Sequence, residues 1–253
     1  MTDIPARLIR LSRDIGREDR RLAILGEGNV SAALGDGTFL VKASGSSLAT
    51  LEAGDLTRVR GDVVMTAVDG PDIDDRGVRA VLEAARVDPA AKLPSVETFM
   101  HAVCLAEGGA AWVGHCHAES VLSILATPHG AEPFQRHLFP DSIVVCGRHV
   151  AVVPYVDPGV DLARAVRRAL GAHAATHGSA AKVVLLENHG AVALGASDRE
   201  VFSILLMLDK WARILGNTLA LGGPRFLTEL ASDRIESRPD EHFRRARIAR
   251  AEG

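Results

Sequence analysis

Short apolar runs of strand length alternate with helical segments along the chain, with no internal repeat or low-complexity linker between them. Extended runs are expected at residues 30–34, 38–43, 57–60, 62–68, 110–116, 143–145, 150–154, 182–186 and 191–194. Helices are expected at residues 4–25, 94–107, 120–126, 161–174 and 197–221. A mobile connection with some helix is expected at 69–91, and a charged surface helix or tail from about 234 to 253. Elements mixed in this way indicate one α/β domain over residues 1–253, long enough to bury a sizeable core.

Local signals predict where several elements turn or begin. Gly35-Asp36-Gly37 favours a hairpin between two strands. Pro94 is expected in a first helical turn, where its missing N–H costs nothing. Asp161 can cap the helix that follows it. Ser197 with Glu200 three residues later is a capping-box pattern.

Charge and cysteine usage exclude several classes of protein. The net charge of −3 gives no sign of a nucleic-acid partner. No apolar run is long enough to cross a bilayer, and the charged N-terminal segment does not resemble a secretory signal. Three widely spaced cysteines, Cys104, Cys116 and Cys146, do not suit a disulfide framework or a four-cysteine zinc site. We therefore expect a cytoplasmic protein without membrane partners.

The sharpest local feature is His115-Cys116-His117 in an expected strand. Residues two apart point to the same face of a strand, with Cα atoms about 6.5–7 Å apart, so two imidazoles can converge on one metal ion. The alternative is two unrelated polar histidines at a strand end. Alternation directs Cys116 to the opposite face, into the core.

Three further residues have both a chemical and an ordinary interpretation. His189 lies in a turn between two apolar strands and is either a ligand or a solvated turn residue. Glu97 lies in a helical first turn, which the helix dipole favours for any carboxylate. His101, one turn later, is a ligand or a packing residue.

Small polar residues near strand and helix ends form another candidate group: Asn29, Ser31, Ser44–Ser47 and Ser95. Such loops offer N–H groups and hydroxyls to an oxyanion, although ordinary turns use the same residues. The glycines match neither a dinucleotide-binding nor a P-loop fingerprint.

Six stretches in this order resemble the class II aldolase/adducin family: GEGNVS (26–31), FLVKASG (39–45), PSVETFMH (94–101), GHCHAES (114–120), VPYVDPG (153–159) and LLENHGAVALG (185–195). The lysine-containing VKASG is most similar to the aldolase portion of bifunctional rhamnulose-phosphate aldolase/alcohol dehydrogenases. Relatives include fuculose-phosphate aldolase and ribulose-phosphate 4-epimerase. The resemblance implies an α/β/α sandwich around a central, largely antiparallel sheet. It also implies a homotetramer with active sites at subunit boundaries.

The resemblance further implies which residues act. His115, His117 and His189 would bind Zn²⁺, or another divalent metal such as Mn²⁺, Co²⁺ or Mg²⁺. Glu97 would be the catalytic carboxylate. The implied substrate-binding pocket contains the small polar residues of the motifs, with a lysine beside them: Asn29, Ser44, Gly45, Ser95 and Lys42. The implied reaction is reversible aldol cleavage of a sugar phosphate or related hydroxy-keto compound through a metal-bound enediolate.

Three positions depart from the family pattern. Val96 follows Ser95 where many relatives have a second serine. Lys42 replaces a usual threonine or serine, and would either hold an anion or point to solvent. The segment 118–149 has no tyrosine to protonate the leaving group, which leaves His137 or a metal-bound water as candidate donors.

Two other functions fit the same motifs. A sugar-phosphate epimerase or a keto-acid phosphate decarboxylase would use the same metal site and the same enediolate. A non-catalytic adducin-like scaffold is expected to lose metal ligands, whereas this chain keeps all three histidines and Glu97. A metal assay separates the scaffold from the enzymes, and product identity separates the enzymes from one another.

Overall fold

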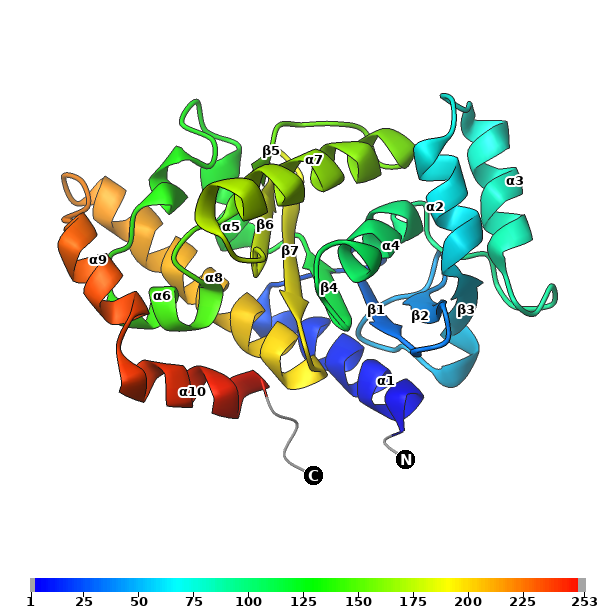
Figure 1. Ribbon diagram of the computed structural model, residues 1–253, viewed down its shortest axis with the longest axis horizontal. Coiled ribbons are helices and arrows are strands. Elements are labelled where there is room, and N and C mark those ends of the chain that lie inside the picture. The colour runs from blue at the N-terminus through cyan, green and yellow to red at the C-terminus, as the bar shows by residue number, and fades with distance from the viewer. Residues whose placement is uncertain (1–2, 250–253) are drawn as a thin grey trace.

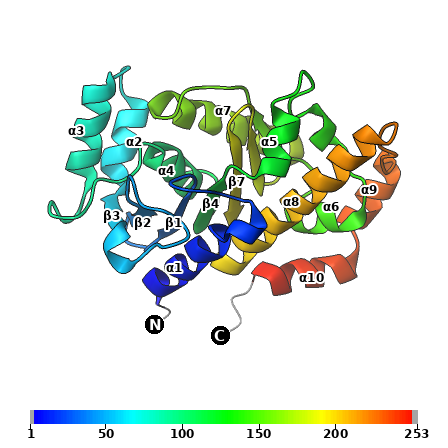
Figure 2. The same cartoon turned by 180° about the vertical axis from the view of Figure 1, so that it is seen from behind.

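A computed structural model describes residues 3–249 as a central seven-stranded sheet with helices on both faces (Figures 1 and 2). The strand order is β3-β2-β1-β4-β7-β6-β5, and every neighbouring pair is antiparallel except β5 and β6. The expected α/β sandwich with a largely antiparallel sheet is confirmed. The strands are β1 (Asn29–Ala33), β2 (Thr38–Lys42), β3 (Leu56–Arg60), β4 (Trp112–Cys116), β5 (Ala151–Val153), β6 (Val183–Leu186) and β7 (Gly190–Gly195).

The helices occupy most of the remaining chain. In the view of Figure 1, α7 lies at the top of the molecule and α1 at the bottom, with the sheet between them. The α-helices are α1 (Ile4–Ile15), α2 (Gly61–Asp69), α3 (Asp75–Ala85), α4 (Thr98–Ala106), α5 (Glu119–Leu125), α6 (Pro140–Cys146), α7 (Val160–His177), α8 (Asp198–Ala220), α9 (Glu229–Glu236) and α10 (Pro239–Ala249). Short 3₁₀ turns lie at Glu18–Arg20, Ala53–Asp55 and Glu132–Gln135.

Side-chain alternation along the strands divides the interior into two cores. In β6, Val183 and Leu185 belong to the cluster that includes α1 and α8, whereas Val184 and Leu186 belong to the cluster that includes α4 and α7. The other strands alternate in the same way, because successive side chains of a strand point to opposite faces. The sheet is therefore buried on both sides.

The strand register brings distant parts of the chain together at one end of the central strands. Asn29, at the start of β1, pairs with His115 near the end of β4. Cys116, the last residue of β4, pairs with Ala191 at the beginning of β7. The turn that carries His189 joins β6 to β7 at this same end of the strands. The candidate residues of three separate motifs therefore meet.

Two expected strands are helices. Residues 62–68 lie in α2, where Val64 and Val68 are buried one turn apart, and residues 143–145 lie in α6. Both segments are rich in β-branched residues, which favour strands, but their helical packing against the rest of the protein outweighs this weak preference. Pro140 begins α6 and supports the helix, as proline does in a first turn.

Several boundaries also differ from expectation. The first helix ends at Ile15 with Gly16 as its C-cap, and a side chain at Gly16 would meet the backbone of Ala49 at 2.3 Å. Pro94 does not begin a helix, because it forms a bridge with Ala43 and α4 starts only at Thr98.

Cap predictions were mixed. Gly159, not Asp161, caps α7. The Ser197 cap is confirmed, because its side chain accepts a hydrogen bond from the Glu200 N–H.

The C-terminal region, expected as a charged helix or tail, forms α9 and α10 up to residue 249, and residues 250–253 lie outside the described part. The expected connection at 69–91 contains α3. Among the described residues, no helix is both long and apolar enough to cross a membrane.

Candidate metal centre

Three imidazole rings converge where β4 ends and β6 turns into β7. The ring centroids of His115 and His117 are 4.8 Å apart, and each lies 5.0 Å from the centroid of His189. The Nε2 atoms of His115 and His117 are 3.0 Å apart. His115 lies in β4 and His117 directly follows the strand; their rings lie together, as the spacing predicted, and Cys116 between them is buried in the core.

Glu97, at the start of α4, lies beside the imidazoles and completes the cluster. It is the N-cap residue of α4, and its Oε1 lies 3.2 Å from Nε2 of His115 and 3.1 Å from Nε2 of His189. Asn29 Nδ2 donates a hydrogen bond to the other carboxylate oxygen. The carboxylate is buried, so it is held in one position by three polar neighbours.

Electrostatics keep the Glu97 carboxylate ionised. Burial raises the pKa of Glu97, but the charge and hydrogen bonds of His115 and His189 outweigh it and hold the pKa well below the usual glutamate range. Burial lowers the pKa of His115, and the charge of Glu97 raises it to a net value above that of an ordinary histidine. Burial, followed by repulsion from His115, lowers the pKa of His117 to about 4.

The four side chains fit a divalent metal. One ligand atom from each lies within 4.8 Å of all the others, and no other such group of His, Cys, Asp and Glu occurs in the described part of the chain. Tetrahedral zinc with bonds of about 2.0–2.1 Å places two nitrogens roughly 3.3 Å apart, close to the 3.0 Å between His115 and His117. Imidazole ligands suit zinc, and carboxylate ligands suit manganese and magnesium.

Two of the expected substrate-pocket residues contact this centre. Ser95 Oγ accepts hydrogen bonds from Asn29 Nδ2 at 3.4 Å and from the Glu97 N–H at 3.3 Å. Oδ1 of Asn29 is buried, with no partner among the described residues. Ser44 and Gly45 lie in the loop after β2, where the Ser44 N–H donates to Leu93 and Gly45 has a φ of +75°.

Lys42 is buried and does not point to solvent, with 2% of its surface exposed. Its Nζ donates hydrogen bonds to the carbonyl oxygens of Ser46 at 2.7 Å and Gly26 at 3.2 Å. Burial lowers the pKa of Lys42, which the charges of Glu97 and Asp55 only partly offset. The ammonium therefore joins two loops that border the site.

Two other histidines have structural partners. His101 is buried in α4, where its Nδ1 lies 2.7 Å from Ser31 Oγ and burial lowers its pKa to about 3. His137 places one ring nitrogen 2.7 Å from Ser142 Oγ and the other 2.9 Å from the Arg148 carbonyl. Both nitrogens of His137 are engaged, so this histidine does not suit the role of proton donor.

Glu27 was missed by the sequence analysis. Its Oε1 lies 3.9 Å from Nδ1 of His117. It lines a cavity of about 700 Å³ together with Gly26 and Gly45. The one available signal was its place two residues before Asn29 in the GEGNVS motif, but the pairing of β1 with β4 cannot be read from local sequence.

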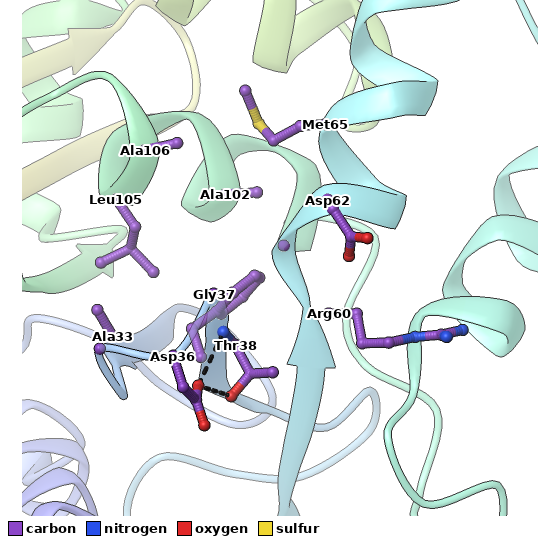
Figure 3. Close-up of a pocket in the computed structure, with 13 residues that line it drawn as sticks. Ala33, Asp36, Gly37, Thr38, Arg60, Asp62, Met65, Ala102, Leu105 and Ala106 are labelled. Carbon is purple, nitrogen blue, oxygen red and sulfur yellow. Dashed lines mark hydrogen bonds between the residues drawn. The ribbon is translucent and has the colours of Figure 1, made fainter.

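A second cavity, of about 670 Å³, lies at the other end of β1 (Figure 3). Asp36, Gly37 and Thr38 of the β1–β2 hairpin face Met65 and Leu105 across it. Ala33 on its wall is four residues from Asn29, about 13 Å along the strand. None of the candidate metal or substrate residues lines this cavity, so it is separate from the metal centre.

The chain was compared with known proteins, and one curated protein is similar to it. Among curated proteins, YuxG of Bacillus subtilis (strain 168), an uncharacterized oxidoreductase, is 27% identical over 203 residues, which cover 77% of this chain and 27% of YuxG. The chain thus spans little more than a quarter of that relative.

Two solved structures share the fold. YgbL from Klebsiella pneumoniae, whose description leaves aldolase, epimerase and decarboxylase activities open, has a TM-score of 0.71 at 24% identity. The alignment covers 93% of this chain and 99% of YgbL. An L-fuculose 1-phosphate aldolase has a TM-score of 0.69 at 17% identity, with 96% of this chain and 97% of that enzyme covered.

Residues 6–215 match the family described as the class II aldolase and adducin N-terminal domain. The match includes the converging histidines, Glu97, Asn29 and the loops around them. The chain therefore belongs to the class II aldolase/adducin family.

Proposed function

We propose that the protein is a metal-dependent lyase that cleaves and forms a C–C bond of a sugar phosphate or related hydroxy-keto compound by aldol chemistry. The observation that carries the proposal is the convergence of three imidazole Nε2 atoms and one buried, ionised carboxylate at a single point. A non-catalytic scaffold has no need for this arrangement, which costs the burial of a charge.

His115, His117 and His189 would hold the divalent metal. When bound, the metal supplies a Lewis acid that stabilises negative charge on substrate oxygens as the C–C bond breaks. Three imidazoles leave coordination positions open for substrate, as catalytic zinc sites do.

Glu97 is suited to move the proton. Its Oε1 lies 3.2 Å from Nε2 of His115 and 3.1 Å from Nε2 of His189, beside the proposed metal position, where it can accept a proton from a substrate carbon or hydroxyl. Asn29 donates to Oε2 and Ser95 accepts the Glu97 N–H, so the carboxylate stays oriented while Oε1 changes protonation. The hydroxyls of Ser44 and Ser95 and the N–H of Gly45 are proposed to hold the non-reacting end of the substrate.

The assembly is proposed to be a homotetramer. Leu206 and Leu219 on α8 and Leu221 directly after it are exposed, the last of them by 86%. Burial of these side chains against another copy would remove apolar surface from water. The family resemblance supports fourfold symmetry with the centre near a subunit boundary.

Proton exchange on the donor substrate tests the function without knowledge of the aldehyde. Dihydroxyacetone phosphate, dihydroxyacetone, pyruvate and glycolaldehyde are each incubated in D₂O with zinc-loaded protein, and deuterium incorporation is followed by NMR. We expect exchange into one donor, abolished by chelation and strongly reduced in Glu97→Gln. Aldehydes are then added to identify the condensation product.

Other outcomes identify the alternatives. Carbon dioxide release from a keto-acid phosphate would assign a decarboxylase, and inversion of a sugar phosphate would assign an epimerase. Both activities are among those left open for YgbL. Exchange that persists after exhaustive chelation would disprove the metal mechanism.

A further inference from the structure

The second ring nitrogens of the three histidines have different surroundings. Nδ1 of His115 lies 3.0 Å from the carbonyl oxygen of Ala191, to which it can donate. Nδ1 of His189 is buried and has no partner among the described residues. Nδ1 of His117 faces the carboxylate of Glu27 at 3.9 Å. Glu27 is thus the acidic side chain directed at the outer face of a candidate ligand.

The sheet register explains how Glu27 reaches this position. β1 and β4 are antiparallel, with Asn29 opposite His115. Continuing this register two residues beyond the strands places Glu27 opposite His117. Gly28 between them has a φ of +71°, and a Cβ there would lie 2.7 Å from the His115 carbonyl oxygen. The glycine allows the loop to pass directly against the strand that carries the ligands.

The turn that presents Glu27 is fixed by several hydrogen bonds. The Glu27 N–H donates to the Ile24 carbonyl at 3.0 Å, and Glu27 Oε2 accepts from the Ile24 N–H at 3.1 Å. Lys42 donates to the neighbouring Gly26 carbonyl. One carboxylate oxygen is therefore used by the turn, while the other, Oε1, remains directed at His117.

We propose that Glu27 is a positioning residue that accepts a hydrogen bond from Nδ1 of His117 and thereby orients this ring toward the metal. The inference rests on the proposed metal site. Closing the 3.9 Å separation to a hydrogen bond of about 2.9 Å requires a side-chain movement of about 1 Å. A carboxylate behind a ligating histidine fixes its tautomer and raises its basicity, and losing such a partner typically costs 10–100-fold in metal affinity.

The substitution Glu27→Gln separates this role from support of the turn. A glutamine oxygen can still accept the Ile24 N–H, so the turn keeps its hydrogen bond while the negative charge is lost. Glu18→Gln is the matched control, because Glu18 lines the same cavity, is exposed and changes the net charge equally. Zinc dissociation constants are measured by competition with a chromogenic chelator, and Co²⁺ absorption spectra report the ligand field.

We expect Glu27→Gln to raise the zinc dissociation constant 10–100-fold and to shift the Co²⁺ spectrum, with the unfolding temperature of the chelator-treated protein unchanged. Glu18→Gln should bind zinc within about twofold of wild type. A wild-type dissociation constant in Glu27→Gln would overturn this inference alone.

Two further outcomes also decide the matter. Weaker zinc binding with a lower unfolding temperature and an unchanged Co²⁺ spectrum would assign Glu27 to the turn and overturn the positioning role. Failure of the wild-type protein to bind zinc or cobalt would instead overturn the proposed function, and the inference with it.

Discussion

Replacement of Lys42 by methionine tests whether this lysine anchors loops or binds the substrate anion. The side chain is 2% exposed, and its Nζ donates to the carbonyls of Gly26 and Ser46. Hydrogen bonds from a charged donor contribute about 1.5–3 kcal/mol each. Methionine preserves most of the buried volume and removes a buried charge, which offsets part of the loss.

The net expectation is a destabilisation of about 3 kcal/mol, because the buried Ser46 carbonyl and the part-buried Gly26 carbonyl lose their partner. For a protein of this size, this corresponds to a fall in unfolding temperature of roughly 6–12 °C. The assay is thermal unfolding followed by circular dichroism, with Lys92→Met as control. Lys92 is a surface lysine paired with Asp55, so its loss should cost less than about 1 kcal/mol.

Steady-state kinetics complete the test. If Lys42 anchors the loops, Lys42→Met should change KM by a similar factor for phosphorylated and unphosphorylated donors. An unchanged unfolding temperature, together with a KM increase confined to phosphorylated donors, would refute the anchoring role and favour the anion-binding prediction.

Three further predictions follow from the geometry. Glu97→Gln should retain zinc and lose about 10²–10⁴-fold in turnover. A loss below tenfold would contradict a role of Glu97 in proton transfer. Burial lowers the pKa of His137 to about 4, below the ordinary 6.5, so stability from its neutral form is complete above about pH 6.5 and is lost as the pH falls toward 4. Between pH 8 and pH 5 the wild type should therefore lose about 2 kcal/mol more unfolding free energy in urea than His137→Asn, and equal losses would contradict this burial. Light scattering should give four times the chain mass of 26.8 kDa, and a monomer at working concentration would contradict the proposed homotetramer.

Much of the fold could be predicted because the strand signals were strong at the centre of the sheet. The hairpin around Asp36, the strand ending at Cys116 and the helix after Ser197 all form as expected. The failures at residues 62–68 and 143–145 share one cause. Their β-branched residues favour strands locally, and only their burial against other elements makes them helical.

The site could be predicted in part for a related reason. His115 and His117, at the end of β4 and directly after it, bring their rings together, which local spacing is sufficient to indicate. The approach of His189 and Glu97 depends on strand order and helix placement, so it was expected only through family resemblance. The position of Glu27 depends on the pairing of two strands about 80 residues apart in sequence, and no local pattern indicates that contact.

Anomalous diffraction at the zinc edge, from crystals of protein purified without a histidine tag, tests the central claim most directly. The account predicts one zinc peak per chain within about 2.0–2.1 Å of the Nε2 atoms of His115, His117 and His189. The peak should disappear in His117→Ala. A zinc-loaded crystal with no peak at these three nitrogens, or with its peak at other residues, would contradict the metal centre and the lyase chemistry built on it.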